Sequence, residues 1–132
     1  MKDIKNQLGT AIEEYGPSLG ISKKDSKKVP TGEIEFPEDI HALRAIRDAL
    51  IEVGDILEEK LDAGIYIAAV KAGSGDANPA LVVALVEGSK CSLAACAREG
   101  LIKQSTAKKA IEKIKKAAHK YIYTHETAVK TL

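Results

Sequence analysis

Four lysines in the last third of the chain have a spacing that would let them act as one surface. They lie four, three and four residues apart and would form a single stripe on a helix: Lys109, Lys113, Lys116 and Lys120. A row of ammonium groups can neutralise successive phosphates, which gives nucleic-acid binding that depends on salt and not on base sequence. The stripe contains no arginine and no aromatic residue, so the pattern does not predict base readout. The competing interpretation is a solvated helix face that pairs in part with an acidic helix.

Two acidic residues, Glu52 and Asp55, lie in the segment ALIEVGDILEEKL. The motif Glu52-Val-Gly-Asp55 is similar to one short motif of MazG-type nucleoside triphosphate pyrophosphohydrolases, which are all-α enzymes. In that family the Glu-x-x-Asp holds magnesium together with an earlier helical Glu-x-x-Glu. The resemblance therefore implies a magnesium site that includes Glu52 and Asp55. The chain departs from the family upstream, because Glu35-Phe-Pro-Glu38 contains a proline that does not fit the middle of a helix. The competing interpretation is a pair of solvent-facing charges on a helix.

The other reactive side chains do not complete a catalytic or metal-binding pattern. Glu38-x-x-His41 has the spacing of a carboxylate–imidazole pair, but a di-iron bundle needs two such pairs and two further carboxylates. The Gly-rich segment 72–78 lacks the Gly-Lys-Ser/Thr of a phosphate-binding loop. The two cysteines have no histidine or acid beside them, so a thiol nucleophile is not supported. We therefore expect no catalytic residue and no cofactor.

The elements that would position these residues surround one apolar segment, residues 78–100, NPALVVALVEGSKCSLAACAREG. Its residues are apolar or small almost all round, so it must be buried. Asn78 suits the cap of a helix and Pro79 its first position, and these flanks predict a helix over 79–99. A row of small residues four positions apart would let this helix cross another at close range, and it consists of Ala84, Gly88 and Ser92.

Amphipathic patterns predict the helices that would cover the central one. Apolar residues three and four positions apart indicate helices over 2–15, 38–62 and 105–124. Residues 16–32, rich in Gly, Ser, Pro and Lys, are expected to form a mobile loop. The short apolar run 65–72 fits either a helix or a strand.

These patterns together predict an all-α fold, a compact bundle of about five helices around the buried central helix 79–99. Aromatic residues make up only 4% of the chain, which favours close helix packing over a β-sandwich. The alternative is an α+β fold with a small sheet formed by 33–36, 65–71 and 80–87. A chain of 132 residues is expected to form a single domain.

The net formal charge is only +1, but the charges are distributed unevenly. Residues 33–62 hold ten acidic and three basic residues, a net charge of −7, whereas residues 101–132 hold eight basic and two acidic residues, a net charge of +6. No apolar run is long enough to cross a membrane, and no secretory signal is recognisable. Cys91 and Cys96 are expected to be buried small residues in a reducing, cytoplasmic compartment.

The first hypothesis for function is a non-catalytic helical protein that forms a homo-oligomer or binds a partner protein. Its basis is the charge contrast between the acidic helix 38–62 and the basic helix 105–124, since opposite faces of this kind can join. The second hypothesis is sequence-independent nucleic-acid binding through the lysine stripe. The third is the magnesium-dependent pyrophosphohydrolase implied by the motif at Glu52 and Asp55.

Overall fold

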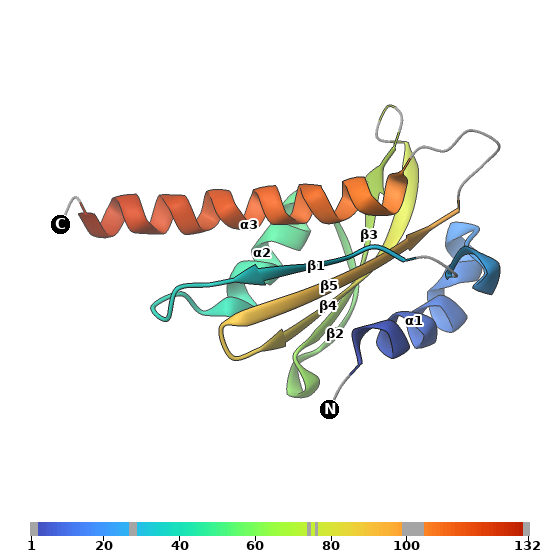
Figure 1. Cartoon of the computed structure of the whole chain (residues 1–132), viewed down its shortest axis with the longest axis horizontal. Helices are drawn as coiled ribbons and strands as arrows, with labels where there is room; N and C mark the ends of the chain where they lie inside the picture. Colours follow the sequence, from blue (N-terminus) through green and yellow to red (C-terminus); the bar gives the residue numbers. More distant parts are fainter. Residues whose placement is uncertain (1–2, 27–28, 74, 76, 99–104, 131–132) are drawn as a thin grey trace.

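The computed structural model describes residues 3–26, 29–73, 75, 77–98 and 105–130 (Figure 1). Within these residues the helices and strands follow the order α1 (Ile4–Leu19), β1 (Thr31–Glu35), α2 (Ala42–Val53), β2 (Gly54–Lys60), β3 (Ile65–Ala72), β4 (Asn78–Glu87), β5 (Lys90–Ala97) and α3 (Thr106–Lys130). Two short 3-10 turns, η1 (Lys23–Ser26) and η2 (Leu61–Ala63), follow α1 and β2. The fold is therefore α+β.

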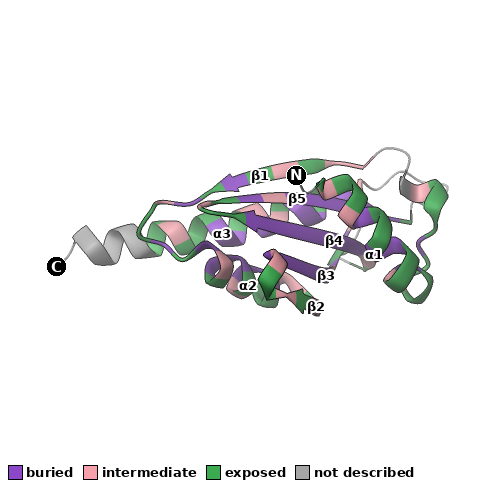
Figure 2. Cartoon of the chain, turned by 90° about the horizontal axis from the view of Figure 1, so that it is seen from below, coloured by how far each residue is buried: buried purple, intermediate pink, exposed green. Residues whose placement is uncertain are grey.

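The strands form one antiparallel sheet in the order β1-β5-β4-β3-β2. Strands β2 to β5 follow one another as neighbours, whereas the chain passes from β1 at one edge to β2 at the other edge through α2. Helix α1 covers one face of the sheet, and α2 and α3 pack side by side on the other face (Figure 1 and Figure 2). The protein is thus built in three layers, with the sheet in the middle.

The central strands β3, β4 and β5 are buried on both faces. In β4, Val82 and Ala84 belong to the core beneath α2 and α3, while Leu81 and Val83 belong to the core beneath α1. A strand covered on both sides needs an apolar residue at almost every position, and so it loses the alternation that identifies a half-buried strand. This is why residues 78–100 are apolar all round, and the helix predicted over 79–99 is wrong.

The predicted all-α bundle of about five helices is therefore also wrong, and the α+β alternative names the correct class. Its segments 65–71 and 80–87 lie within β3 and β4, and 33–36 overlaps β1, whereas β2 and β5 were not predicted.

The small residues proposed for close helix packing form no helical row. Ala84 lies in β4, Gly88 in the turn that follows, and Ser92 in β5. Their spacing of four residues therefore spans a β-hairpin and places no two helices in contact.

The acidic helix predicted over 38–62 corresponds to two elements, since α2 ends at Val53 and β2 begins at Gly54. A Cβ atom at Gly54 would collide with the carbonyl oxygen of Ala69 on β3, so a glycine is needed for the two strands to pair here. Leu57 fits the helical spacing of apolar residues that predicted a helix over 38–62. In the structure it lies where the register of β2 shifts against β3. The helical pattern of this segment thus runs past the true end of the helix.

The terminal helices agree more closely with the sequence patterns. Helix α1, predicted over 2–15, continues through Pro17 to Leu19, so the expected loop 16–32 begins inside it. Helix α3, predicted over 105–124, runs from Thr106 to Lys130. Residues 27–28 of the expected loop lie outside the described residues. In the described part of the chain, no helix is both long enough and apolar enough to cross a membrane.

Two glycines with open surroundings should respond to alanine in opposite directions. Gly88, in the turn between β4 and β5, has a φ of +63°, whereas Gly9 lies inside α1. A Cβ built at either position would meet no atom within 4 Å beyond its chain neighbours and, for Gly9, the backbone of its own helix. We predict that Gly88→Ala lowers the free energy of unfolding by about 1–2 kcal/mol, because L side chains rarely adopt this φ. Gly9→Ala should raise it by about 0.5–1 kcal/mol through helix propensity.

Urea denaturation of the parent and the variants measures these changes. Gly88→Leu should match Gly88→Ala, because the cost comes from the backbone and not from crowding. A Gly88→Leu variant that is far less stable than Gly88→Ala would show close packing at the turn and contradict this placement.

Candidate functional site

The four lysines of the predicted stripe lie on α3, but two of them already bond to the rest of the chain. Lys113 Nζ donates to the carbonyl oxygen of Lys71 at 2.9 Å. Lys120 Nζ lies 2.8 Å from a carboxylate oxygen of Glu52 on α2, which is the pairing of basic and acidic helices considered from the sequence. Lys109 and Lys116 are exposed. The stripe is therefore a broken row of ammonium groups with two members held by the protein itself.

The residues of the magnesium motif are not on one helix. Glu52 lies in α2 and pairs with Lys120, whereas Asp55 lies in β2. Within the described ranges, no group of three or more His, Cys, Asp or Glu side chains could hold a metal ion. The all-α fold implied by the resemblance to MazG-type enzymes also differs from the observed sheet. The structure therefore does not support the resemblance.

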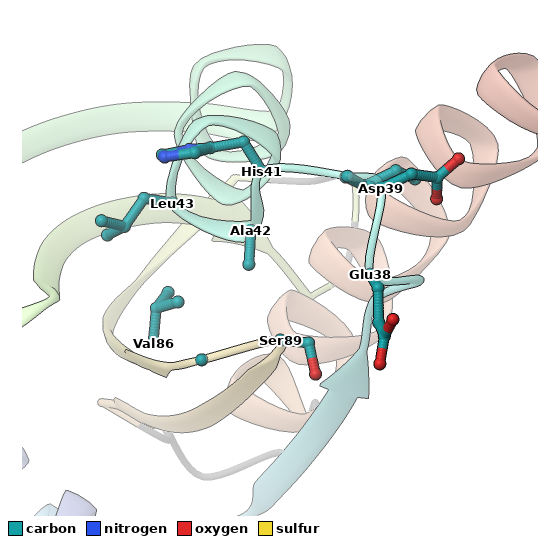
Figure 3. A pocket seen from close by; sticks show the side chains of 9 residues that line it. Glu38, Asp39, His41, Ala42, Leu43, Val86 and Ser89 are labelled. Carbon is teal, nitrogen blue, oxygen red and sulfur yellow. The ribbon is translucent and has the colours of Figure 1, made fainter.

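A hollow of about 510 Å³ opens where the segment before α2 meets the turn between β4 and β5 (Figure 3). Residues 38–43 line one side, and Val86, Gly88 and Ser89 line the other. We call this hollow the turn groove. It brings together two segments that are more than 40 positions apart in the sequence.

Two hydrogen bonds hold the segment that forms the first wall of the turn groove. Phe36 N donates to the carbonyl oxygen of Ser89 at 2.7 Å, which ties the end of β1 to the β4–β5 turn. The Nδ1 atom of His41 accepts a hydrogen bond from Arg44 N at 3.3 Å and so caps the N-terminus of α2. The groove therefore lies on two anchored backbone segments.

The turn groove combines an apolar interior with an acidic rim. Ala42 and Val86 point into the hollow, whereas His41 and Asp39 extend away from it (Figure 3). Glu38 is exposed beside the hollow, so the rim carries a carboxylate. A group that suits this chemistry has an apolar or aromatic body with a hydroxyl or cationic group beside it.

Helix α3 extends past the sheet that it covers (Figure 1). Ile114 and Ala118 lie in its buried stripe, and Tyr121 continues their helical spacing but is 40% exposed. Tyr123 is 71% exposed. A second hollow of about 180 Å³ lies between Tyr121 and the start of α2, and residues 39–41 line both this hollow and the turn groove. The end of α3 and the turn groove are therefore neighbours.

Neither the turn groove nor the exposed end of α3 was predicted as a site from the sequence. The walls of the groove, 38–43 and 86–89, meet only because the sheet places β1 and the β4–β5 turn together. The helical spacing of Tyr121 does signal that the apolar stripe continues. It gives no sign of where the sheet beneath the helix ends.

Comparisons with protein-family models, with curated protein sequences and with solved structures gave no significant match.

The two cysteines are buried and free, as the sequence predicted. Cys91 faces α2 and α3, and Cys96 faces α1, where its Sγ lies 3.2 Å from the carbonyl oxygen of Asp25. Burial raises the pKa of the Cys91 thiol from 9.0 to about 12 and that of the Cys96 thiol from 9.0 to about 11. Both thiols therefore remain neutral in the folded protein at a pH where they would ionise in the unfolded chain.

These shifts predict slow thiol alkylation in the folded state. At pH 8, iodoacetamide should modify both native thiols at least about a hundredfold more slowly than in urea, because the thiolate is the nucleophile. The raised pKa values also stabilise the fold below pH 9, and this stabilisation should be lost as the pH rises towards 11 and 12. A Leu61→Cys variant, at an exposed position, supplies a thiol that should react quickly without urea. Native thiols that react as fast as Cys at position 61 would contradict their burial.

Proposed function

We propose that this protein is a non-catalytic interaction protein that assembles with further copies of itself through the C-terminal end of α3. The main support is the exposure of Tyr121. Its side chain is 40% exposed, although Ile114 and Ala118 of the same helical stripe are fully buried. Tyr121 follows this stripe at the margin of the core, where Ile122 is only partly buried, so part of the aromatic ring of Tyr121 is open to a further molecule.

The length of α3 supports the same proposal. Among the described side chains of α3, Ile122 is the last that packs against the core, and the helix continues from there to Lys130. Most of the stability of a helix in a protein comes from packing its amphipathic face, so the end of a long helix is stabilised by a partner that packs against it. Aromatic side chains are also enriched at the centres of protein interfaces. A second molecule on this end would both cover Tyr121 and stabilise the last turns.

Nucleic-acid binding has less support than self-assembly. The hydrogen bond of Lys113 and the ion pair of Lys120 would have to be exchanged for phosphate contacts. That exchange would offset part of the electrostatic gain from each of these lysines.

Sedimentation equilibrium over a range of protein concentrations tests the proposal. We expect the parent to exceed the monomer mass at high concentration, and Tyr121→Ser to raise the dissociation constant about tenfold or more. The matched control is Leu61→Ser, which removes an apolar side chain that is 56% exposed on η2, away from the end of α3 (Figure 1). This control should assemble like the parent. A parent that remains monomeric at every concentration would contradict the proposal. An equal rise of the dissociation constant in the two variants would contradict it as well.

A further inference from the structure

Assembly through α3 requires a surface that receives the helix end. On the basis of the proposed self-assembly, we infer that the turn groove of a second copy receives the end of α3, and that two copies exchange this contact in a closed dimer. Each copy then supplies one helix end and one groove.

The size and lining of the turn groove suit a tyrosine side chain. Its volume of about 510 Å³ lies within the roughly 300–1,000 Å³ of pockets that hold small molecules, which is ample for one aromatic ring. Tyr123, with 71% of its side chain exposed, is the tyrosine at the end of α3 that is best placed to enter. Its ring would lie against Ala42 and Val86.

The charges on the two surfaces are complementary. Exposed Glu38 makes the rim of the groove acidic. Lys116 is exposed and precedes Tyr123 by seven residues, so it lies on the same side of α3 and would approach that rim. Opposite charges across an interface speed the encounter and select the orientation. The contact should therefore weaken as the salt concentration rises.

The position of the two surfaces favours a closed dimer of identical copies. A two-fold interface needs one patch that contains both an inserting element and its receiving surface. This chain meets that requirement, because residues 39–41 line the turn groove and also line the hollow beside Tyr121. A two-fold axis through this patch would place each helix end against the groove of the other copy. An open head-to-tail chain would instead need the two surfaces on distant sides of the molecule.

Filling the groove is the first test. Ser89 is half-buried on its wall, whereas Ser18 is exposed near the end of α1. We expect Ser89→Trp to raise the dimer dissociation constant at least tenfold in sedimentation equilibrium, and Ser18→Trp to leave it within twofold. Thermal melts establish that both variants are folded. A Ser89→Trp variant that is folded and dimerises like the parent would overturn the inference.

Cross-linking tests the contact directly. A variant with Ser89→Cys and Thr124→Cys carries thiols at the groove and at the end of α3, while the native thiols are buried. When ¹⁴N and ¹⁵N copies are mixed and treated with a short bismaleimide, mass spectrometry should find mixed-isotope links between positions 89 and 124. The control variant, Gly9→Cys with Thr124→Cys, should give no link between positions 9 and 124.

The results separate this contact from the proposed self-assembly. If Tyr121→Ser dissociates the oligomer, but positions 89 and 124 do not link and Ser89→Trp has no effect, the helix end assembles on another surface. In that case the exchange into the groove is wrong and the self-assembly stands. If the parent is a monomer at every concentration, both are wrong.

Discussion

The structure depends on covering both faces of the three apolar strands β3, β4 and β5. Each face would otherwise expose a continuous apolar surface of Val, Ile, Leu and Ala side chains. Burying apolar surface stabilises a fold by roughly 25 cal/mol per Å². One helix, α1, covers one face, while α2 and α3 share the other. Two helices fit on one face of this sheet because small residues line the contact, among them Ala45 and Ala49 of α2 and Ala110 and Ala118 of α3. The frequent alanines thus allow helices to approach a sheet closely, as well as one another.

Sequence patterns identified the helices that have one buried face and missed the strands that have two. The amphipathic spacing in α1 and α3 survives because one side of each helix meets water. The segment 78–100 has no such side, and Asn78-Pro79 resembled the start of a helix. In the structure, Asn78 Nδ2 instead donates to the carbonyl oxygen of Arg98 at 2.9 Å and to Thr106 Oγ1 at 3.0 Å, which joins the start of β4 to α3. The sequence did contain one signal for the hairpin. Gly88-Ser89 separates two apolar runs by two residues, as a tight β-turn requires.

Prediction of the site residues from the sequence was limited in the same way, because spacing describes one element at a time. Helical spacing correctly placed Lys109, Lys113, Lys116 and Lys120 on one helix. It could not show that the backbone of Lys71 and the carboxylate of Glu52 would engage two of them, because these contacts join positions 42 and 68 residues apart. The turn groove is non-local in the same way. Motifs that need only one element can be read from a sequence, whereas a surface formed by a loop and a distant turn requires the fold.

The edges of the sheet explain why assembly would use a helix end in preference to strand pairing. At the β2 edge, the register shift at Leu57 interrupts the ladder, and such irregularities oppose pairing with another sheet. The side chains of this strand are also engaged: Glu59 lies 2.8 Å from Arg47, and Glu58 accepts a hydrogen bond of 2.6 Å from the Tyr15 hydroxyl, which raises the pKa of Tyr15 to about 12.

At the opposite edge, β1 has only five residues and exposes Glu33 and Glu35. Pairing two copies of β1 antiparallel would bring these carboxylates close together, and like charges on facing strands are destabilising. Both edges thus resist extension of the sheet. The described part of the end of α3 instead combines exposed aromatic rings with Lys116, whose charge is opposite to that of Glu38 at the rim of the turn groove.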